Sequence, residues 1–134
     1  MAQWWLSSQA DRRERTYGIL VVENDAIIKD AITRALHPWA QFEVHTATTG
    51  MEAIAKSATQ HYDLVILASH LPDMDGKTVF RTLCKKRPVC ALALSADPRA
   101  SREQLRTEGF ADCLLKPFTT ADLLEHVQNL CPGT

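Results

Sequence analysis

The sequence lacks several features that would assign it to a specialised class of protein. Its net charge is only −1, from 15 basic and 16 acidic residues, so no overall field draws the chain to nucleic acid or to a membrane surface. No apolar run approaches the roughly 20 residues that a membrane-spanning helix needs. The first residues lack an early basic cluster and a long apolar core, so we expect no signal peptide. These absences favour a cytoplasmic protein that binds neither nucleic acid nor membrane.

Patterns of metal-binding and disulfide-forming residues are missing as well. The five histidines are scattered, and the cysteines show no CxxC pair and no zinc spacing. The four cysteines are Cys84, Cys90, Cys113 and Cys131. Three of the four lie in or beside apolar runs, so we expect the thiols to be reduced and mostly buried.

The length of 134 residues fits one domain with a short extension. Residues 1–16 are interpreted as an N-terminal extension, in which Trp4, Trp5 and Leu6 precede a charged run. The extension is either a frayed end or a short helix that docks its tryptophans on this domain or on a partner, because paired tryptophans are costly to leave in water. Residues 17–131 are interpreted as the folded domain.

Short apolar runs rich in branched side chains alternate with segments of helical periodicity. This pattern predicts five strands, at 17–22, 41–46, 64–68, 89–94 and 111–115. Parallel strands joined by helical crossovers are the expected outcome. The sequence therefore predicts an α/β fold, a doubly wound (βα)5 flavodoxin-like parallel sheet with strand order 2-1-3-4-5 and residues 41–46 at an edge.

Polar residues at the helix starts supply the expected N-caps, which are Asn24 or Asp25, Thr49, Asp75, and Thr119 or Thr120. Glu52, three residues after Thr49, would complete a capping box, and Asp97-Pro98 would start another helix. Helical spacing predicts that the helix after Thr49 buries Met51, Ile54, Ala55 and Ala58. It predicts that the helix before Pro38 buries Ile27, Ile28, Ala31, Ile32, Ala35 and Leu36.

Polar residues also follow four of the five strands, at the edge where open α/β sheets bind ligands. They are Glu23-Asn24-Asp25 after the first strand, Ser69-His70 after the third, Ser95 after the fourth and Lys116 after the fifth. In the predicted order these strands are neighbours, so their polar residues should converge on one shallow pocket. A carboxylate, a hydroxyl and an ammonium together could bind an oxyanion or a small cation.

Four segments carry a resemblance to a known family. They are ILVVEND at 19–25, YDLVIL and SHLPDMDG on either side of residue 68, LALSA at 92–96 and LLKPF at 114–118. In this order, residues 17 to about 130 resemble the receiver domain of bacterial two-component response regulators. The resemblance implies an aspartate that accepts a phosphoryl group from a histidine kinase, an acidic Mg²⁺ site, a hydroxyl and a lysine that contact the phosphoryl oxygens, and a switching aromatic residue.

Part of that set is present in this sequence. Glu23 stands at the first acidic position, and Ser95 and Lys116 stand at the hydroxyl and lysine positions. The resemblance makes the Lys116-Pro117 bond a candidate for the cis isomer.

Three positions depart from the family. Ala68 stands where the phosphoacceptor aspartate is expected, Asn24 stands at the second acidic position, and Cys113 stands at the switch position. A methyl group cannot attack phosphorus. Mg²⁺ needs oxygen ligands, and Glu23 is the one carboxylate left of three, so we expect no Mg²⁺, no other cofactor and no enzymatic activity. Lys116, without its usual counter-ion, should pair with Glu23.

Three hypotheses follow. In the first, the chain is a phosphorylation-independent receiver-like module that contacts a histidine kinase or an output domain. Such a module could also form a homodimer, either through the segments 98–107, 111–115 and 120–130 or through the Trp4/Trp5 arm. In the second, it is a conventional phosphoacceptor that uses a displaced carboxylate, Asp25 or Asp73. In the third, it is a flavodoxin-like protein that binds a flavin or a nucleotide, although Glu23-Asn24-Asp25 is no Gly- or Thr-rich phosphate cradle.

Overall fold

The sheet has five parallel strands in the order β2-β1-β3-β4-β5, as the sequence predicted. The computed structural model describes residues 16–99 and 102–131. The strands are β1 (Tyr17–Val22), β2 (Phe42–Ala47), β3 (Leu64–Ala68), β4 (Ala91–Ser95) and β5 (Asp112–Leu115). Residue pairing runs in parallel register across the sheet, with Val22 opposite Ala47 on one side and opposite Leu67 on the other.

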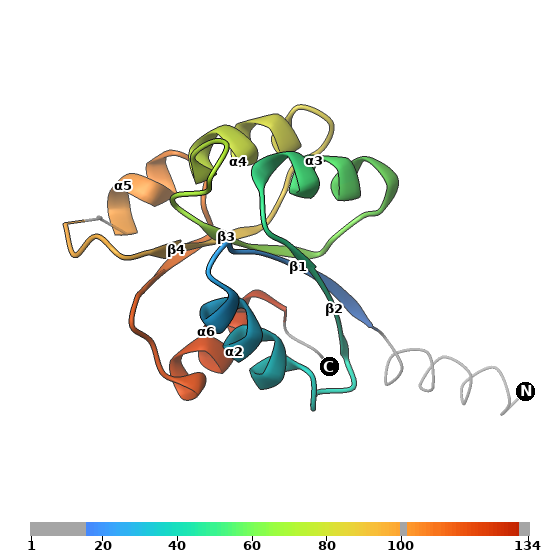
Figure 1. The fold of residues 1–134 in the computed structure, drawn as a ribbon, viewed down its shortest axis with the longest axis vertical. Helices are drawn as coiled ribbons and strands as arrows, with labels where there is room; N and C mark the ends of the chain where they lie inside the picture. The colour runs from blue at the N-terminus through green and yellow to red at the C-terminus, as the bar shows by residue number, and fades with distance from the viewer. Residues whose placement is uncertain (1–15, 100–101, 132–134) are drawn as a thin grey trace, which may run out of the picture.

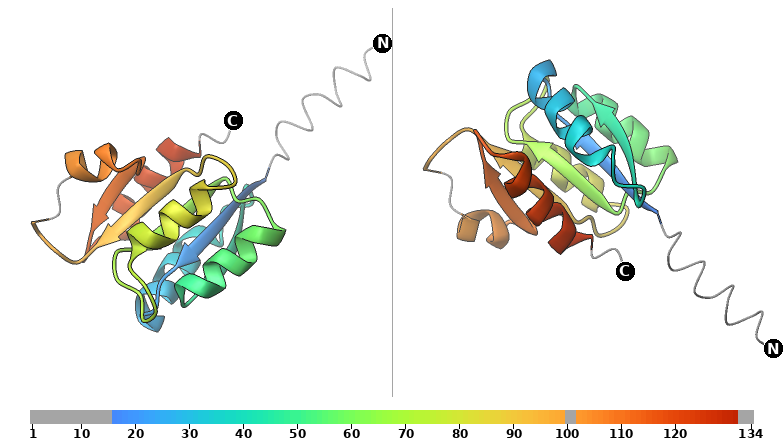
Figure 2. Two further views of the ribbon diagram at one scale, coloured as in Figure 1. Left: turned by 90° about the horizontal axis from the view of Figure 1, so that it is seen from above. Right: turned by 90° about the horizontal axis from the view of Figure 1, so that it is seen from below.

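Helices cover both faces of this sheet (Figures 1 and 2). They are α2 (Ala26–Leu36), α3 (Gly50–Thr59), α4 (Gly76–Cys84), α5 (Arg102–Thr107) and α6 (Thr120–Leu130). In Figure 1, α3, α4 and α5 lie above the sheet, and α2 and α6 lie below it. The fold is therefore the doubly wound (βα)5 arrangement.

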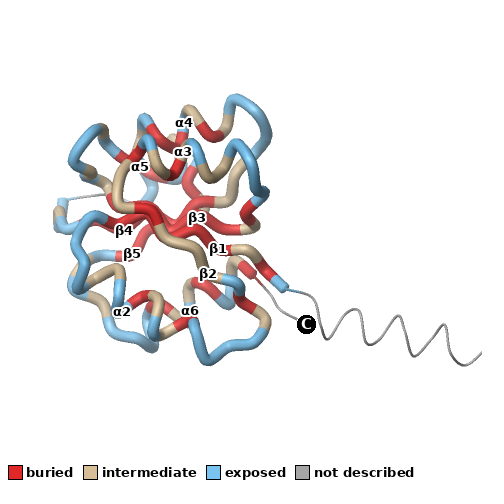
Figure 3. Tube along the Cα trace, turned by 45° about the vertical axis from the view of Figure 1, so that its right-hand side comes forward, coloured by how far each residue is buried: buried red, intermediate tan, exposed pale blue. Residues whose placement is uncertain are grey.

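Two apolar layers hold the helices to the sheet. Alternate strand residues pack on opposite faces, so Val65 and Leu67 belong to the layer under α3, α4 and α5, whereas Leu64 and Ile66 belong to the layer over α2 and α6. All five residues of β3 are buried, and so are all five of β4. Figure 3 shows this burial concentrated along the central strands. A central strand buried on both faces explains why its sequence is continuously apolar.

The predicted helix caps are found in the structure, with two alternatives resolved. Asp25 caps α2, Asp75 caps α4 and Thr119 caps α6. Thr49 caps α3 and accepts a hydrogen bond from the backbone N–H of Glu52. Glu52 does not complete the predicted capping box, because its carboxylate accepts the N–H and the hydroxyl of Thr48 instead.

The predicted inward face of α3 was wrong. Met51, Ala55 and Ala58 are exposed, whereas Gly50 and Ala53 are buried and Ile54 is partly buried. In a short helix rich in alanine, the apolar spacing fits more than one face. Gly50 decides the face, since a Cβ at that position would overlap the side chains of Met74 and Val79.

Smaller corrections concern α2 and the segment after β4. In α2, Ile27 and Ala31 are exposed, while Ile32 and Leu36 are buried. The proposed helix start at Asp97-Pro98 was wrong, because the Asp97 carboxylate accepts the N–H of Arg99 at 2.9 Å and closes a turn. The second strand also begins and ends one residue later than predicted.

The four cysteines are free thiols; Cys113 and Cys131 are buried and the other two partly so. Within the described ranges 16–99 and 102–131, every helix is too short or too polar to cross a bilayer. The Trp4/Trp5 arm lies outside the described residues.

Candidate functional site

A buried ion pair joins two of the strand ends that were predicted to converge. Glu23, directly after β1, is 2% exposed, and its Oε1 lies 2.5 Å from the Nζ of Lys116, directly after β5. The other carboxylate oxygen, Oε2, accepts the backbone N–H of Asp25 at 3.0 Å. The predicted pairing of Lys116 with Glu23 is thus confirmed, and it places a counter-charge beside the buried carboxylate.

The side chains of Asn24 and Asp25, which follow Glu23, lie outside this ion pair. Asn24 is exposed. Asp25 is also exposed, and its Oδ1 accepts the N–H groups of Ile27 at 2.9 Å and Ile28 at 3.3 Å, which fixes the start of α2.

Ala68 ends β3 with its methyl group buried, at 1% exposure. The chain then folds back, so that Gly76 lies against the carbonyl of Ala68 and donates its N–H to the carbonyl of Ser69 at 2.8 Å. A Cβ at position 76 would overlap the carbonyl oxygen of Ala68, so glycine is needed there for the close approach. Ser69 donates its hydroxyl to the carbonyl of Leu94 at 2.9 Å, which ties this loop to β4.

Ser95, at the end of β4, is 3% exposed and is engaged locally. Its Oγ accepts the backbone N–H of Asp97 at 3.1 Å. Its carbonyl accepts the N–H of Lys116 at 2.7 Å, which holds the β4 and β5 ends together.

The remaining members of the predicted set lie on β5 and just beyond it. The Lys116–Pro117 peptide bond is cis, as the resemblance implied. Cys113 is buried in the layer under α3, α4 and α5, and burial raises the pKa of its thiol. It therefore acts here as a small apolar side chain.

Two loop aspartates after β3 both stabilise helix starts. Asp73 accepts the N–H of Gly50 at 2.8 Å and of Met51 at 2.9 Å, across 22 to 23 residues of chain, and these bonds lower its pKa. Asp75 accepts the N–H of Thr78 at 2.9 Å, and its hydrogen bonds to Thr78 lower its pKa. The cap on α4 was predicted, but the long-range cap on α3 was missed, because no local spacing encodes it.

The residues at this edge do not fit a Mg²⁺ site. Glu23 is the one carboxylate at the centre, and it is committed to Lys116 and to a backbone N–H. Asp25 is committed to α2, and Ala68 offers no ligand atom. In residues 16–99 and 102–131, no three histidine, cysteine or acidic side chains come together as a potential metal site. Mg²⁺ in proteins is usually held through one or two carboxylates together with water, and the one carboxylate at the centre of this edge is engaged by Lys116.

A cavity of about 160 Å³ lies beside Ala68, and no motif of the sequence predicted it. The loop after β3 forms one side of it, and Leu67, Ala93, Leu105 and Phe110 form an apolar wall. Phe110 stacks on Phe80 with ring centroids 4.4 Å apart, so the ring is held in the core.

Comparison with known proteins agrees with this architecture. The model of the response regulator receiver domain matches residues 19–128. The transcriptional regulatory protein PrrA of Mycobacterium tuberculosis is 32% identical over 117 residues, which cover 84% of this chain and 48% of PrrA. The cell cycle response regulator CtrA of Brucella ovis is 29% identical over 111 residues, covering 81% of this chain and 47% of CtrA. The chain belongs to the response regulator receiver domain family, and it spans about half the length of these curated relatives.

Solved structures give the same assignment. The signal receiver domain of a putative LuxO repressor from Vibrio parahaemolyticus has a TM-score of 0.80 at 22% identity, covering 87% of this chain and 91% of that one. The receiver domain of the sensor histidine kinase PA1611 from Pseudomonas aeruginosa, solved with a magnesium ion in its active-site cleft, has a TM-score of 0.76 at 26% identity, covering 87% and 98%. The sequence-based assignment of fold and family is thereby confirmed.

Proposed function

We propose that this chain is a receiver domain that signals without phosphorylation at the end of β3, and that it acts by contacting other proteins of a two-component system. It would be a binding module and not an enzyme, and it would work without Mg²⁺.

One observation carries the proposal, namely the 2.5 Å pair between Glu23 and Lys116 beside the buried methyl group of Ala68. Phosphoryl transfer needs a nucleophile, and the methyl group supplies none. It also needs positive charge free to meet the transferring group, and the ammonium of Lys116 is already neutralised by Glu23. Both requirements fail at the same place.

Apolar side chains around the same edge support action by protein contact. Four large apolar residues in the described ranges are exposed, namely Ile27 at 82%, Met51 at 61%, Leu115 at 44% and Trp39 at 37%. Ile27 and Met51 lie in the first turns of α2 and α3, and Leu115 ends β5, so these three lie at the carboxyl-terminal edge of the sheet, whereas Trp39 precedes β2 at the opposite edge. The presence of three of the four at one edge supports a contact surface there.

The relatives indicate what kind of partner to expect. PrrA is a transcriptional regulatory protein twice as long as the matched region, and the sensor protein EvgS of Escherichia coli is 35% identical over 92 residues, which cover 66% of this chain and 8% of EvgS. We therefore propose histidine kinases or output domains in the cytoplasm as partners. A homodimer through α5, β5 and α6 is a further arrangement within this proposal.

The test is incubation of the purified chain with acetyl phosphate and Mg²⁺, followed by intact-mass measurement. A receiver that has aspartate at the end of β3 is treated in parallel to show that the phosphodonor is active. We expect no gain of a phosphoryl group by this chain.

A gain of one phosphoryl group would overturn the proposal in favour of a conventional phosphoacceptor with a displaced carboxylate. Peptide mapping, with Asp25→Asn and Asp73→Asn as variants, would then locate the acceptor. Both carboxylates are occupied by backbone N–H groups of helix starts, which argues against either as a nucleophile. Membership in the receiver family also favours these two hypotheses over a flavin-binding protein.

A further inference from the structure

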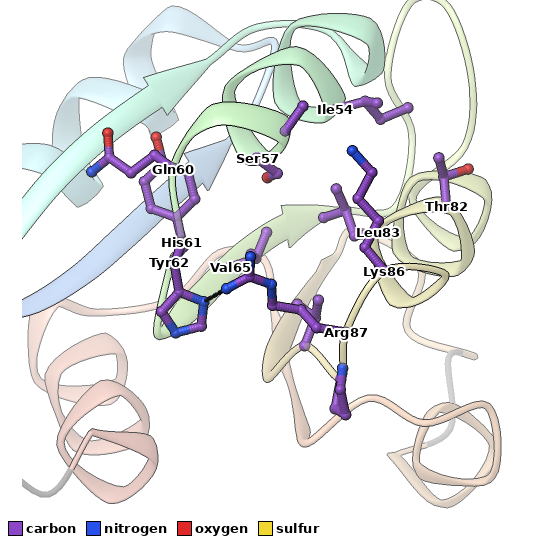
Figure 4. Close-up of a pocket in the computed structure, with 13 residues that line it drawn as sticks. Ile54, Ser57, Gln60, His61, Tyr62, Val65, Thr82, Leu83, Lys86 and Arg87 are labelled. Atoms are coloured by element: carbon purple, nitrogen blue, oxygen red, sulfur yellow. Dashed lines mark hydrogen bonds between the residues drawn. The ribbon is translucent and has the colours of Figure 1, made fainter.

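A second pocket lies at the opposite end of the sheet, where β3 begins and where α3 and α4 end (Figure 4). Its volume is about 90 Å³. We call it the amino-end pocket. Its inner wall is apolar and is formed by Ile54, Val65, Leu83 and Val89. The polar side chains that line it belong to Ser57, Gln60, His61, Tyr62, Thr82, Lys86 and Arg87.

The charge of the amino-end pocket has one sign. None of the thirteen residues that line it is acidic, and Lys86 and Arg87 are both basic. Among the described residues, neither of the two has a carboxylate within ion-pair distance. The carboxyl ends of α3 and α4 each contribute about half a negative charge, so two full positive charges leave a net positive site.

Arg87 is oriented without being neutralised. Its Nη1 donates to Nδ1 of His61 at 3.0 Å, as the dashed line in Figure 4 shows. A guanidinium can only donate, so the ring nitrogen accepts this bond, and the other ring nitrogen, Nε2, lies 3.7 Å from Asp63 Oδ1. One of the five guanidinium donors is thus used, and the others remain available to a planar acceptor.

Ser57, on the α3 side of the pocket, takes no part in the binding proposed here. Its Oγ has no hydrogen-bond partner within the described residues, but it is inaccessible to solvent, so a ligand does not reach it.

From these features we propose that the amino-end pocket binds a small organic carboxylate with a short apolar body. The apolar body would occupy the wall formed by Ile54, Val65 and Leu83, and the carboxylate would meet Arg87 and Lys86. This site lies away from Glu23, Ala68 and Lys116, so it does not depend on the phosphorylation state of the receiver. A ligand there would bridge the ends of α3 and α4.

The test is a titration of ¹⁵N-labelled chain with isobutyrate, with the neutral isostere isobutyramide as the matched ligand. We expect isobutyrate to shift the amide resonances of residues 57–61 and 86–89 with a dissociation constant of about 1 mM, and isobutyramide to bind at least about tenfold more weakly. Acetate and inorganic phosphate should also bind more weakly, because they lack the apolar body.

Variants separate this site from general attraction of anions. Lys86→Met and Arg87→Met should each weaken isobutyrate binding about tenfold. Lys85→Met is the matched control, since it removes the same charge from the adjacent residue, whose side chain does not line the pocket, and it should change binding less than about twofold. The amide spectrum of each variant shows whether it is folded.

Four results would overturn the proposal. They are shifts that do not localise to this pocket, equal binding of isobutyramide, equal binding of acetate or phosphate, and a loss of binding in Lys85→Met as large as that in Lys86→Met. None of these results depends on whether the chain accepts a phosphoryl group, so the two proposals fail separately.

Discussion

Lysines at the two ends of the sheet are in opposite situations. At the carboxyl-terminal edge, Lys116 is mostly buried and lies 2.5 Å from the carboxylate of Glu23. At the amino-terminal edge, Lys86 is exposed and lies beside a pocket with no acidic residue. The first lysine is therefore part of what holds the domain together, whereas the second is free to meet something from outside.

The same contrast extends to the hydroxyl groups. Ser95 is buried and accepts the N–H of Asp97, so its oxygen is used within the chain. Ser57 lacks a hydrogen-bond partner among the described residues, and its oxygen is inaccessible to solvent. At the carboxyl-terminal edge the charges of Glu23 and Lys116 lie against each other, whereas Lys86 and Arg87 at the other edge line a pocket without an acidic residue.

The largest expected effect comes from removing the charge of Lys116. Lys116→Met leaves Glu23 buried without a counter-charge, which should lower the free energy of unfolding by about 3 kcal/mol. Lys86→Met removes an exposed charge and should change it by less than about 0.5 kcal/mol. Urea denaturation of both variants measures the difference. Similar losses in the two variants would show that the Lys116 pair contributes no more than a surface charge.

A smaller effect is expected from rebuilding the acidic site. Ala68→Asp together with Asn24→Asp restores three carboxylates around the edge, and Mg²⁺ should then raise the melting temperature. At a Mg²⁺ concentration of ten times the dissociation constant, the gain in the free energy of unfolding is about 1.4 kcal/mol. The unaltered chain should show no such shift, and Ala68→Asp alone should restore little phosphorylation. If the double variant melts at the same temperature with and without Mg²⁺, the geometry inferred for this edge is wrong.

The smallest effect concerns Asp73, which is an exposed residue. Its bonds to the N–H groups of Gly50 and Met51 lower its pKa in the folded state, so the stability that they contribute is present above the unfolded pKa of about 4 and is lost as the pH falls through the folded pKa. Asp73→Asn should therefore lower the melting temperature at neutral pH and make little difference in acid. Asp30→Asn, which removes only a surface pair with Arg34, is the control and should change the melting temperature less. A deficit of Asp73→Asn that is independent of pH would contradict this account.

Prediction from the sequence succeeded where the signal is local. The cap at Asp75, and the cap of α2 at Asn24 or Asp25, followed from residue types at the helix starts. The strand order followed from the alternation of strands and helices along the chain, and the cis Lys116–Pro117 bond from the family resemblance. It failed for α3, where Met51 is exposed and Ala53 is buried, because the apolar spacing of a ten-residue helix fits two faces. The packing of Gly50 against Met74 and Val79 determines which face of α3 is buried, and that contact joins residues more than twenty positions apart.

At the candidate site, too, local sequence signals predicted some features, and long-range packing determined the others. The absence of an attacking oxygen at residue 68 and the pairing of Lys116 with Glu23 could be predicted, since both depend on which residue types follow which strands. The bonds from Asp73 to the start of α3, the cavity beside Ala68 and the amino-end pocket could not, because each depends on how separate helices meet over the sheet.

The sequence by itself determined the doubly wound sheet and the absence of an attacking oxygen at residue 68, because hydrophobic periodicity and residue identity are written directly in the chain. Only the tertiary structure decided which charges are neutralised and which remain free. That outcome depends on distances of a few ångströms between residues far apart in the sequence, and Coulomb and hydrogen-bond energies change steeply over such distances.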